Sequence, residues 1–179
     1  MNTILVVDQE PRICGVIRDF FENNRGMPVQ CAHTGSEATR MLMHNHYELA
    51  LISAPLPGSS DFDLSMLSVK ERIPALLMTR DPVLRLMLQQ FAFPYLGKPF
   101  TPDAVRVAAE RVMSDPDGHL ARLEASLGML RTHRNAQVRM MNESDRLLSL
   151  ARAQQQLGHW DFAVARVKAS SLNEGTADC

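Results

Sequence analysis

The chain has few cysteines, few aromatic residues and almost no net charge, and these scarcities exclude several classes of function. Cys14, Cys31 and Cys179 are odd in number and lack CxxC spacing, so neither a disulfide framework nor a zinc site is indicated. A formal net charge of −1 over 179 residues provides no broad field to attract nucleic acid or an anionic membrane. No apolar run approaches the roughly 20 residues that span a bilayer, and no basic leader precedes the first run. We therefore expect a cytoplasmic globular protein without a membrane partner.

Short apolar runs alternate with helical patterns over the first 113 residues. The runs 4–7, 49–52 and 75–78 lack polar alternation, which is typical of strands buried on both faces of a parallel sheet. The helical patterns begin with residues suited to a first helical turn or cap, at Pro11, Thr34 and Thr101. This alternation predicts an α/β fold with a doubly wound parallel sheet, whose sites lie at the carboxyl ends of the strands. Asp8, Ser53 and Thr79 stand at those ends.

Three blocks of sequence carry a family resemblance. Ile4–Pro11 and Glu48–Gly58 are apolar runs that each lead into a turn, and Tyr95–Phe100 (Tyr-Leu-Gly-Lys-Pro-Phe) completes the set. In this order they resemble the receiver (CheY-like) domain of bacterial two-component response regulators, over residues 1–113. The resemblance implies a five-stranded parallel sheet of the CheY and flavodoxin type. It also implies a site in which an acidic pair binds magnesium, an aspartate accepts a phosphoryl group, and a threonine and a lysine respond to its charge.

This sequence departs from the family at that site. The family's positions fall here on Asp8 and Gln9 (acidic pair), Ser53 (phosphoacceptor), Thr79 and Tyr95 (switch residues) and Lys98 (lysine). Two of the three carboxylates are therefore missing. An amide and a hydroxyl are poor replacements for carboxylate ligands of magnesium, and a serine without an adjacent base is a weak nucleophile. We expect a degenerate pseudo-receiver, not an enzyme, that binds no metal or cofactor and in which Asp8 pairs with Lys98.

The second half of the resemblance is compressed. Only 19 positions separate Thr79 from Lys98, an interval that in the family holds the fourth helix and fifth strand. We expect this face to be shorter by about one helical turn and to present an altered partner surface. With no phosphoryl group to bind, Thr79 is expected to satisfy local backbone groups and Tyr95 to pack in the core. The peptide bond before Pro99 is cis in the family, and we expect the same here.

The composition changes after Met113. Residues 114–118 (Ser-Asp-Pro-Asp-Gly) are typical of a linker, residues 119–172 have helical patterns only, and residues 173–179 are expected to be disordered. A 3-4-3 spacing of apolar residues marks the first helix, at Leu120, Leu123, Leu127 and Leu130. We expect a second helix over about 136–156, an interruption at Leu157–Trp160 and a third helix from Phe162. Because such a stripe needs a partner surface, we predict a homodimer mediated partly by residues 120–150.

Two resemblances compete for the end of the chain. Leu157-Gly158 and Trp160 resemble a single tetratricopeptide hairpin, which would make this region a protein-interaction module with Trp160 at its surface. The same segment resembles a Fis-type helix-turn-helix. From Ser114 on, however, eight Lys and Arg residues balance eight Asp and Glu residues, so the sequence does not favour nucleic acid as a partner. The sequence thus favours a phosphorylation-independent signalling protein with an unknown protein partner. Two alternatives stay open: a Fis-like transcription regulator, and a receiver with unusual metal or phosphate chemistry.

Overall fold

The computed structural model describes residues 3–57 and 62–173, with only the backbone described for residue 151 and for residues 153–173. The strands are β1 (Ile4–Val7), β2 (Val29–Ala32), β3 (Leu49–Ser53), β4 (Ala75–Thr79) and β5 (Tyr95–Gly97). The helices are α1 (Pro11–Arg25), α2 (Gly35–His44), α3 (Asp63–Lys70), α4 (Pro82–Gln90), α5 (Pro102–Met113) and α6 (Pro116–Asn173). All strand pairs are parallel, in the order β2-β1-β3-β4-β5. The predicted five-stranded, doubly wound sheet is confirmed.

Local sequence signals set the ends of several helices. Thr34 caps α2 by accepting a hydrogen bond from the Glu37 amide at 3.2 Å. Asp81 caps α4 in the same way, through the Val83 amide at 2.8 Å. Gly26 ends α1 in the left-handed conformation, with a φ of 61° that glycine adopts without steric cost. These caps fix where each helix leaves the sheet.

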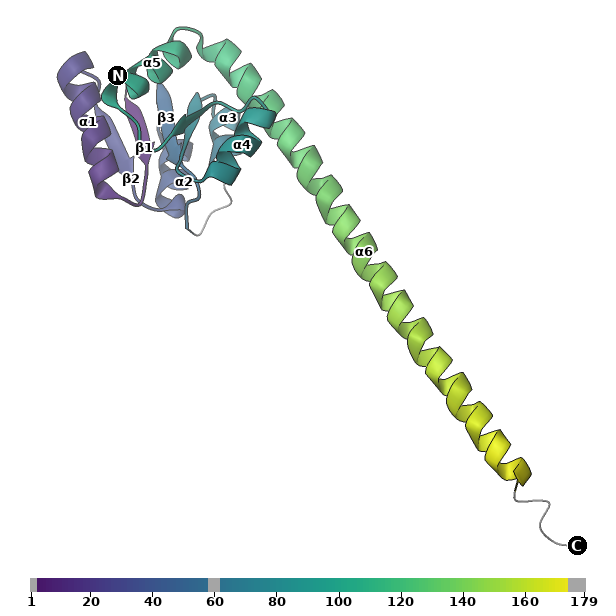
Figure 1. The fold of residues 1–179 in the computed structure, drawn as a ribbon. Coiled ribbons are helices and arrows are strands. Elements are labelled where there is room, and N and C mark those ends of the chain that lie inside the picture. Colours follow the sequence, from purple (N-terminus) through teal and green to yellow (C-terminus); the bar gives the residue numbers. More distant parts are fainter. Residues whose placement is uncertain (1–2, 58–61, 174–179) are drawn as a thin grey trace, which may run out of the picture. The chain divides into compact units, whose positions relative to one another are not determined.

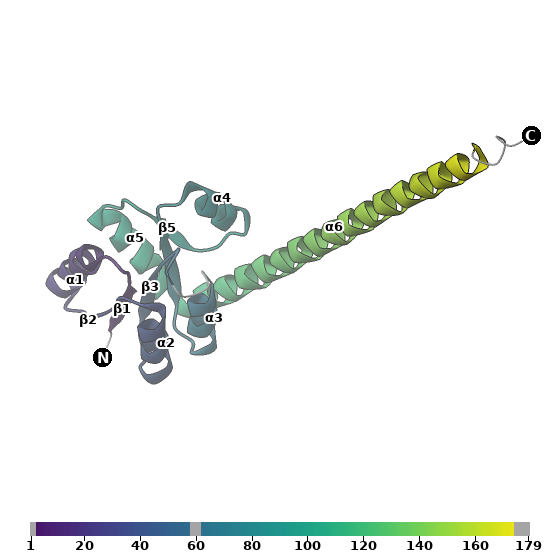
Figure 2. The same ribbon diagram turned by 90° about the horizontal axis from the view of Figure 1, so that it is seen from below.

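The sheet is covered on both faces, as Figures 1 and 2 show. Helices α1 and α5 cover one face, where Ile4 and Val6 of β1 point. Helices α2, α3 and α4 cover the other face, together with Leu5 and Val7. Because successive side chains of a strand point to opposite faces, a fully apolar strand such as β1 serves both cores.

The first turns of α6 belong to the second core. Leu123 is fully buried, and Leu127 and Leu130 are also buried, in the same cluster as Leu88 of α4. The Ser126 hydroxyl donates a hydrogen bond to the Ala92 carbonyl at 3.3 Å. The leucine stripe therefore packs within its own chain, and its assignment as a dimer contact is wrong for Leu123, Leu127 and Leu130. Leu120 is half-buried. Residues up to Arg131 form one compact unit with the sheet, so this unit extends past the expected boundary at Met113.

Helix α6 is continuous from Pro116 to Asn173, which corrects the expected division of this region. Its start leaves only Ser114 and Asp115 between α5 and α6, so there is no linker over 114–118. The expected interruption at Leu157–Trp160 is helical, so the backbone has neither the turn of a tetratricopeptide hairpin nor that of a helix-turn-helix. The part of α6 beyond Arg131 belongs to a second unit, and residues 174–179 of the expected disordered tail lie outside the described residues. Among the described helices, none is both long and apolar enough to cross a membrane.

Candidate functional site

Asp8, Ser53 and Lys98 meet at the carboxyl ends of β1, β3 and β5. The Lys98 ammonium group donates to Asp8 Oδ2 at 2.5 Å and to Ser53 Oγ at 3.0 Å. The side chains of Asp8 and Lys98 are 1% and 7% exposed, so this is an ion pair shielded from solvent. Such a pair replaces the hydration that both charges lose on burial.

The second oxygen of Asp8 is also occupied. Oδ1 accepts a hydrogen bond from the Glu10 amide at 2.9 Å, which closes the turn between β1 and α1. Gln9, the other member of the expected pair, is exposed beside this turn. Within the described part of the chain, no group of three or more Asp, Glu, His or Cys side chains could hold a metal ion. The arrangement satisfies Asp8 with an amide and an ammonium group.

Two arginines that the sequence did not identify as site residues hold the neighbouring loops. Arg80 forms an ion pair with Glu10, which joins the end of β4 to the start of α1. Arg85 of α4 donates to the carbonyl oxygens of Thr79, at 3.3 Å, and of Lys98. A Cβ atom on Gly97 would lie 3.3 Å from the Arg85 guanidinium carbon, so the glycine permits this close approach. Nothing in the sequence marked Arg85 as a residue of this site.

Thr79 and Tyr95 have local partners. Thr79 is fully buried and its hydroxyl accepts a hydrogen bond from the Asp81 amide at 3.1 Å, at the start of α4. Tyr95 is half-buried against the α2–α3–α4 core, and its hydroxyl accepts from the Gln89 side chain at 2.7 Å. The peptide bond between Lys98 and Pro99 is cis, as expected. Trp160 lies within α6, where its side chain is outside the described residues.

Cys14 of α1 lies close to the backbone of Asp8. Its thiol is buried and lies 3.8 Å from the Asp8 carbonyl oxygen. Burial, and after it the neighbouring Cys31 and Asp8, raise the pKa of this thiol to about 12. Cys14 is thus a neutral packing residue at neutral pH.

Solved structures similar to this chain include receiver domains of response regulators. The non-phosphorylated HemR receiver domain from Leptospira biflexa is 26% identical with a TM-score of 0.55, and the match covers 64% of this chain and 95% of that one. The regulator TrrA from Thermotoga maritima, in complex with Mg²⁺ and BeF, is 25% identical with a TM-score of 0.55, covering 63% and 99%. A receiver domain from Clostridium thermocellum is 21% identical with a TM-score of 0.55, covering 64% and 95%.

The chain has the CheY-like receiver fold. The predicted resemblance is confirmed at the level of fold, and these matches support a response-regulator signalling role. No protein-family model and no curated protein sequence matches the chain. The chain thus has a CheY-like fold, and Asp8, Ser53 and Lys98 are in contact at the carboxyl ends of its strands.

Proposed function

We propose that this receiver is a non-catalytic, phosphorylation-independent cytoplasmic signalling protein that acts by binding other proteins. The observation that carries the proposal is the buried contact of Lys98 with both Asp8 and Ser53. In this arrangement the lysine already has an anionic partner and a hydroxyl partner. It does not need a phosphoryl group to neutralise its charge.

The same contacts argue against phosphoryl transfer. Magnesium prefers carboxylate and phosphate oxygens in octahedral geometry, and both oxygens of Asp8 already accept hydrogen bonds. Ser53 accepts a hydrogen bond from an ammonium group, which lowers the nucleophilicity of its oxygen. Without a metal to neutralise the charge of the transferred group, the reaction lacks its main source of stabilisation.

A restored variant tests this proposal most sharply. Gln9→Asp combined with Ser53→Asp returns the two missing carboxylates to the site while Thr79 and Lys98 stay in place. With magnesium and acetyl phosphate, we expect intact-mass spectra to show a phosphoryl adduct on the restored variant and none on the parent. An adduct on the parent that disappears in Ser53→Ala would refute the proposal and support the alternative of unusual phosphate chemistry.

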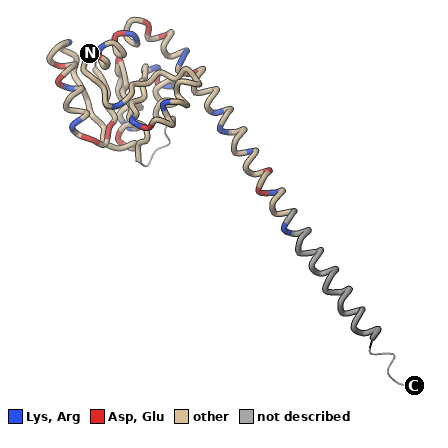
Figure 3. The backbone as a smooth tube through the Cα atoms, in the orientation of Figure 1, with Lys and Arg blue, Asp and Glu red and all other residues tan. Residues whose placement is uncertain are grey.

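The interaction surface that we propose lies on the part of α6 beyond Arg131, where residues of both charges are spread along the described part of the helix (Figure 3). Met140, Met141, Leu147 and Leu148 are 54–67% exposed, and a spacing of seven residues relates Met140 to Leu147 and Met141 to Leu148. Residues so spaced share one face of a helix. A single helix cannot bury its own apolar face, and most helical stability in proteins comes from covering it. The occupant that we propose is the same face of a second copy, in a symmetric homodimer.

Two matched substitutions test the homodimer. Leu148→Glu places a charge on this face. Asn142→Glu places one at an exposed residue on a different side of α6, because no spacing of three, four or seven residues relates Asn142 to any residue of the face. We expect sedimentation equilibrium to show a dimer for the parent and for Asn142→Glu, and a monomer for Leu148→Glu. A parent that stays monomeric at tens of micromolar would contradict the dimer and would assign the face to a different protein.

A further inference from the structure

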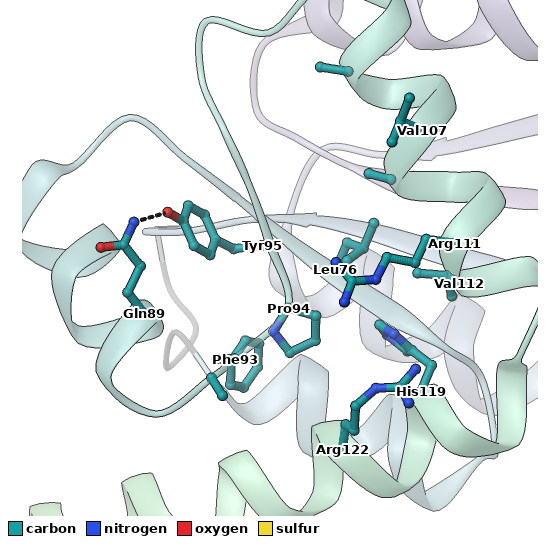
Figure 4. Close-up of a pocket in the computed structure, with 13 residues that line it drawn as sticks. Leu76, Gln89, Phe93, Pro94, Tyr95, Val107, Arg111, Val112, His119 and Arg122 are labelled. Carbon is teal, nitrogen blue, oxygen red and sulfur yellow. Dashed lines mark hydrogen bonds between the residues drawn. The ribbon is translucent and has the colours of Figure 1, made fainter.

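A cavity of about 660 Å³ lies at the β5 edge of the receiver, between the end of α4, α5 and the first turns of α6 (Figure 4). Pockets for small organic molecules have volumes of roughly 300–1,000 Å³. The residues that line it all precede Arg131 and include none of Asp8, Ser53, Thr79 and Lys98. It is therefore separate from the site described above.

Most of the cavity wall is apolar. Leu76 of β4, Phe93 before β5 and Val112 of α5 are buried core residues that also face this space. Val107, one helical turn and a half before Val112, is 50% exposed and lies at the rim. A wall of this kind favours a ligand with an apolar body, because contact removes hydrocarbon surface from water.

One end of the cavity is positively charged. Figure 4 shows the side chains of Arg111 from α5 and Arg122 from α6 gathered around His119. Arg122 has an exposed ion pair with Asp115 at 3.3 Å, whereas no ion pair of Arg111 is found in the described part of the chain. His119 is 4% exposed, and its Nε2–H donates to the Ala75 carbonyl at 2.8 Å. Arg122 thus has one solvent-screened carboxylate partner and Arg111 has none in the described part of the chain, which leaves an excess of positive charge beside an apolar wall.

The other end is bordered by the hydrogen-bonded pair of Gln89 and Tyr95. Figure 4 shows this pair on the far side of Pro94 from the two arginines. The cavity therefore has an apolar middle, a cationic end and a neutral polar end. A molecule that matches this order has an anionic group at one end and a ring or short chain attached to it.

We propose that this cavity binds a small amphipathic organic anion, with its anionic group between Arg111 and Arg122 and its apolar body against Leu76 and Val112. The guanidinium group is planar and offers paired N–H donors. It therefore matches the oxygen atoms of a carboxylate or sulfonate better than the ammonium group of a lysine, which acts as a point charge. Because α6 supplies Arg122 and His119, this site exists only in a receiver that carries the α6 extension in this position. The inference stands independently of the function proposed above.

The probe for this test is 1-anilinonaphthalene-8-sulfonate, an aromatic sulfonate whose fluorescence rises in apolar surroundings. N-phenyl-1-naphthylamine, which has the same rings without the charge, is the matched ligand. In fluorescence titrations we expect Arg111→Gln and Arg122→Gln each to weaken binding of the sulfonate on the order of tenfold, as the loss of one charged hydrogen bond predicts. Binding of the neutral analogue should stay unchanged. Arg106→Gln is the control, because Arg106 also lies on α5 but pairs with Asp103 and Glu110 outside the cavity.

Two further measurements locate the probe. Ala108→Phe fills the cavity and should abolish binding of both compounds, whereas Leu148→Glu on the exposed face of α6 should not affect either. In the parent protein, the probe should shift the backbone amide resonances of Tyr95 and Val112 and leave that of Gln9 in place. Unchanged sulfonate affinity in both arginine variants, or loss of binding in Leu148→Glu alone, or no shift at Tyr95 and Val112, would overturn the proposal.

Discussion

Removal of the Asp8 carboxylate is the most direct perturbation of the receiver site. Asp8→Ala leaves Lys98 buried, with only the Ser53 hydroxyl at 3.0 Å as a described partner. Breaking a buried ion pair from one side typically costs about 3–5 kcal/mol, because the remaining charge is left without compensation. The hydrogen bond from the Glu10 amide to Asp8 is lost as well, which adds about 1 kcal/mol. The Ser53 hydroxyl offsets part of this cost, so we expect a loss of about 3–4 kcal/mol.

A double-mutant cycle separates the ion pair from other effects of the substitution. Lys98→Met removes the charge and keeps most of the side-chain volume, and Asp8→Ala with Lys98→Met leaves no buried charge at all. We expect the double variant to be more stable than Asp8→Ala, because a lone buried charge costs more than its absence. The free energy of unfolding is measured by urea titration followed by circular dichroism.

Asp117→Asn is the control for this cycle. It breaks the ion pair between Arg72 and Asp117, whose side chains are 75% and 86% exposed, and it should change the free energy of unfolding by less than about 1 kcal/mol. The reasoning is refuted if Asp8→Ala unfolds within about 0.5 kcal/mol of the parent. It is also refuted if the effects of Asp8→Ala and Lys98→Met simply add, because the two side chains would then not be energetically coupled.

Three further predictions concern other parts of the receiver unit. Leu123→Ala should lower the free energy of unfolding by about 2–5 kcal/mol, because Leu123 is fully buried. Leu147→Ala, at a position that is 62% exposed, is the control and should change this free energy little. Both are measured by urea titration of dilute, monomeric protein. Burial lowers the pKa of His119 below its ordinary 6.5. As the pH decreases, His119 is therefore protonated in the unfolded chain before it is protonated in the folded protein. The free energy of unfolding should then fall as the pH decreases below about 6.5. Urea titrations at several pH values should show that His119→Gln removes this part of the pH dependence. Cys14 should resist iodoacetamide at pH 8 in native protein and react after unfolding, as peptide mass mapping can show.

The sequence was informative where strands are buried on both faces. Strands β1, β3 and β4 are fully buried apolar runs, so their composition alone identifies them. Strand β2 was not predicted because it is an edge strand of four residues, with Gln30 exposed in its middle. The short interval before Lys98 holds α4, which has nine residues, and β5, which has three. The positions of Asp8 and Ser53 followed from the ends of β1 and β3, whereas that of Lys98 followed from the family resemblance.

The C-terminal region was harder to predict because helix ends depend on small energy differences. Pro116 was interpreted as part of a linker, but proline is favoured in a first helical turn, and Asp115 caps α6 by accepting from the Gly118 amide at 3.0 Å. Gly158 was interpreted as a break, although one glycine inside a helix costs only about 1 kcal/mol. No proline follows Pro116, so no residue there forces the helix to end.

The leucine spacing predicted an apolar stripe but could not identify the surface that covers it. A stripe at 3-4-3 spacing can pack against a helix of another chain, and it can equally pack against an uncovered part of the chain's own core. In this receiver it packs beside α4, where Leu123 lies in the same core cluster as Leu88. The choice between these two surfaces depends on contacts distant in sequence, which periodicity does not encode.

The contacts around α4 bear on how such a receiver could carry a signal. A switch requires two conformations that differ by a few kcal/mol and a ligand that binds one of them better. Here Arg85 of α4 binds the carbonyl groups of Thr79 and Lys98, and Leu88 on the same helix packs with Leu123. A movement of α4 would break both sets of contacts at once, and with a hydroxyl at Ser53 no phosphoryl group is expected to compensate for them. We therefore infer that a regulatory input to this receiver acts at a surface away from Ser53. The cavity beside Arg111 and the exposed face of α6 are two places in the described part of the chain that offer a ligand or a partner new contacts.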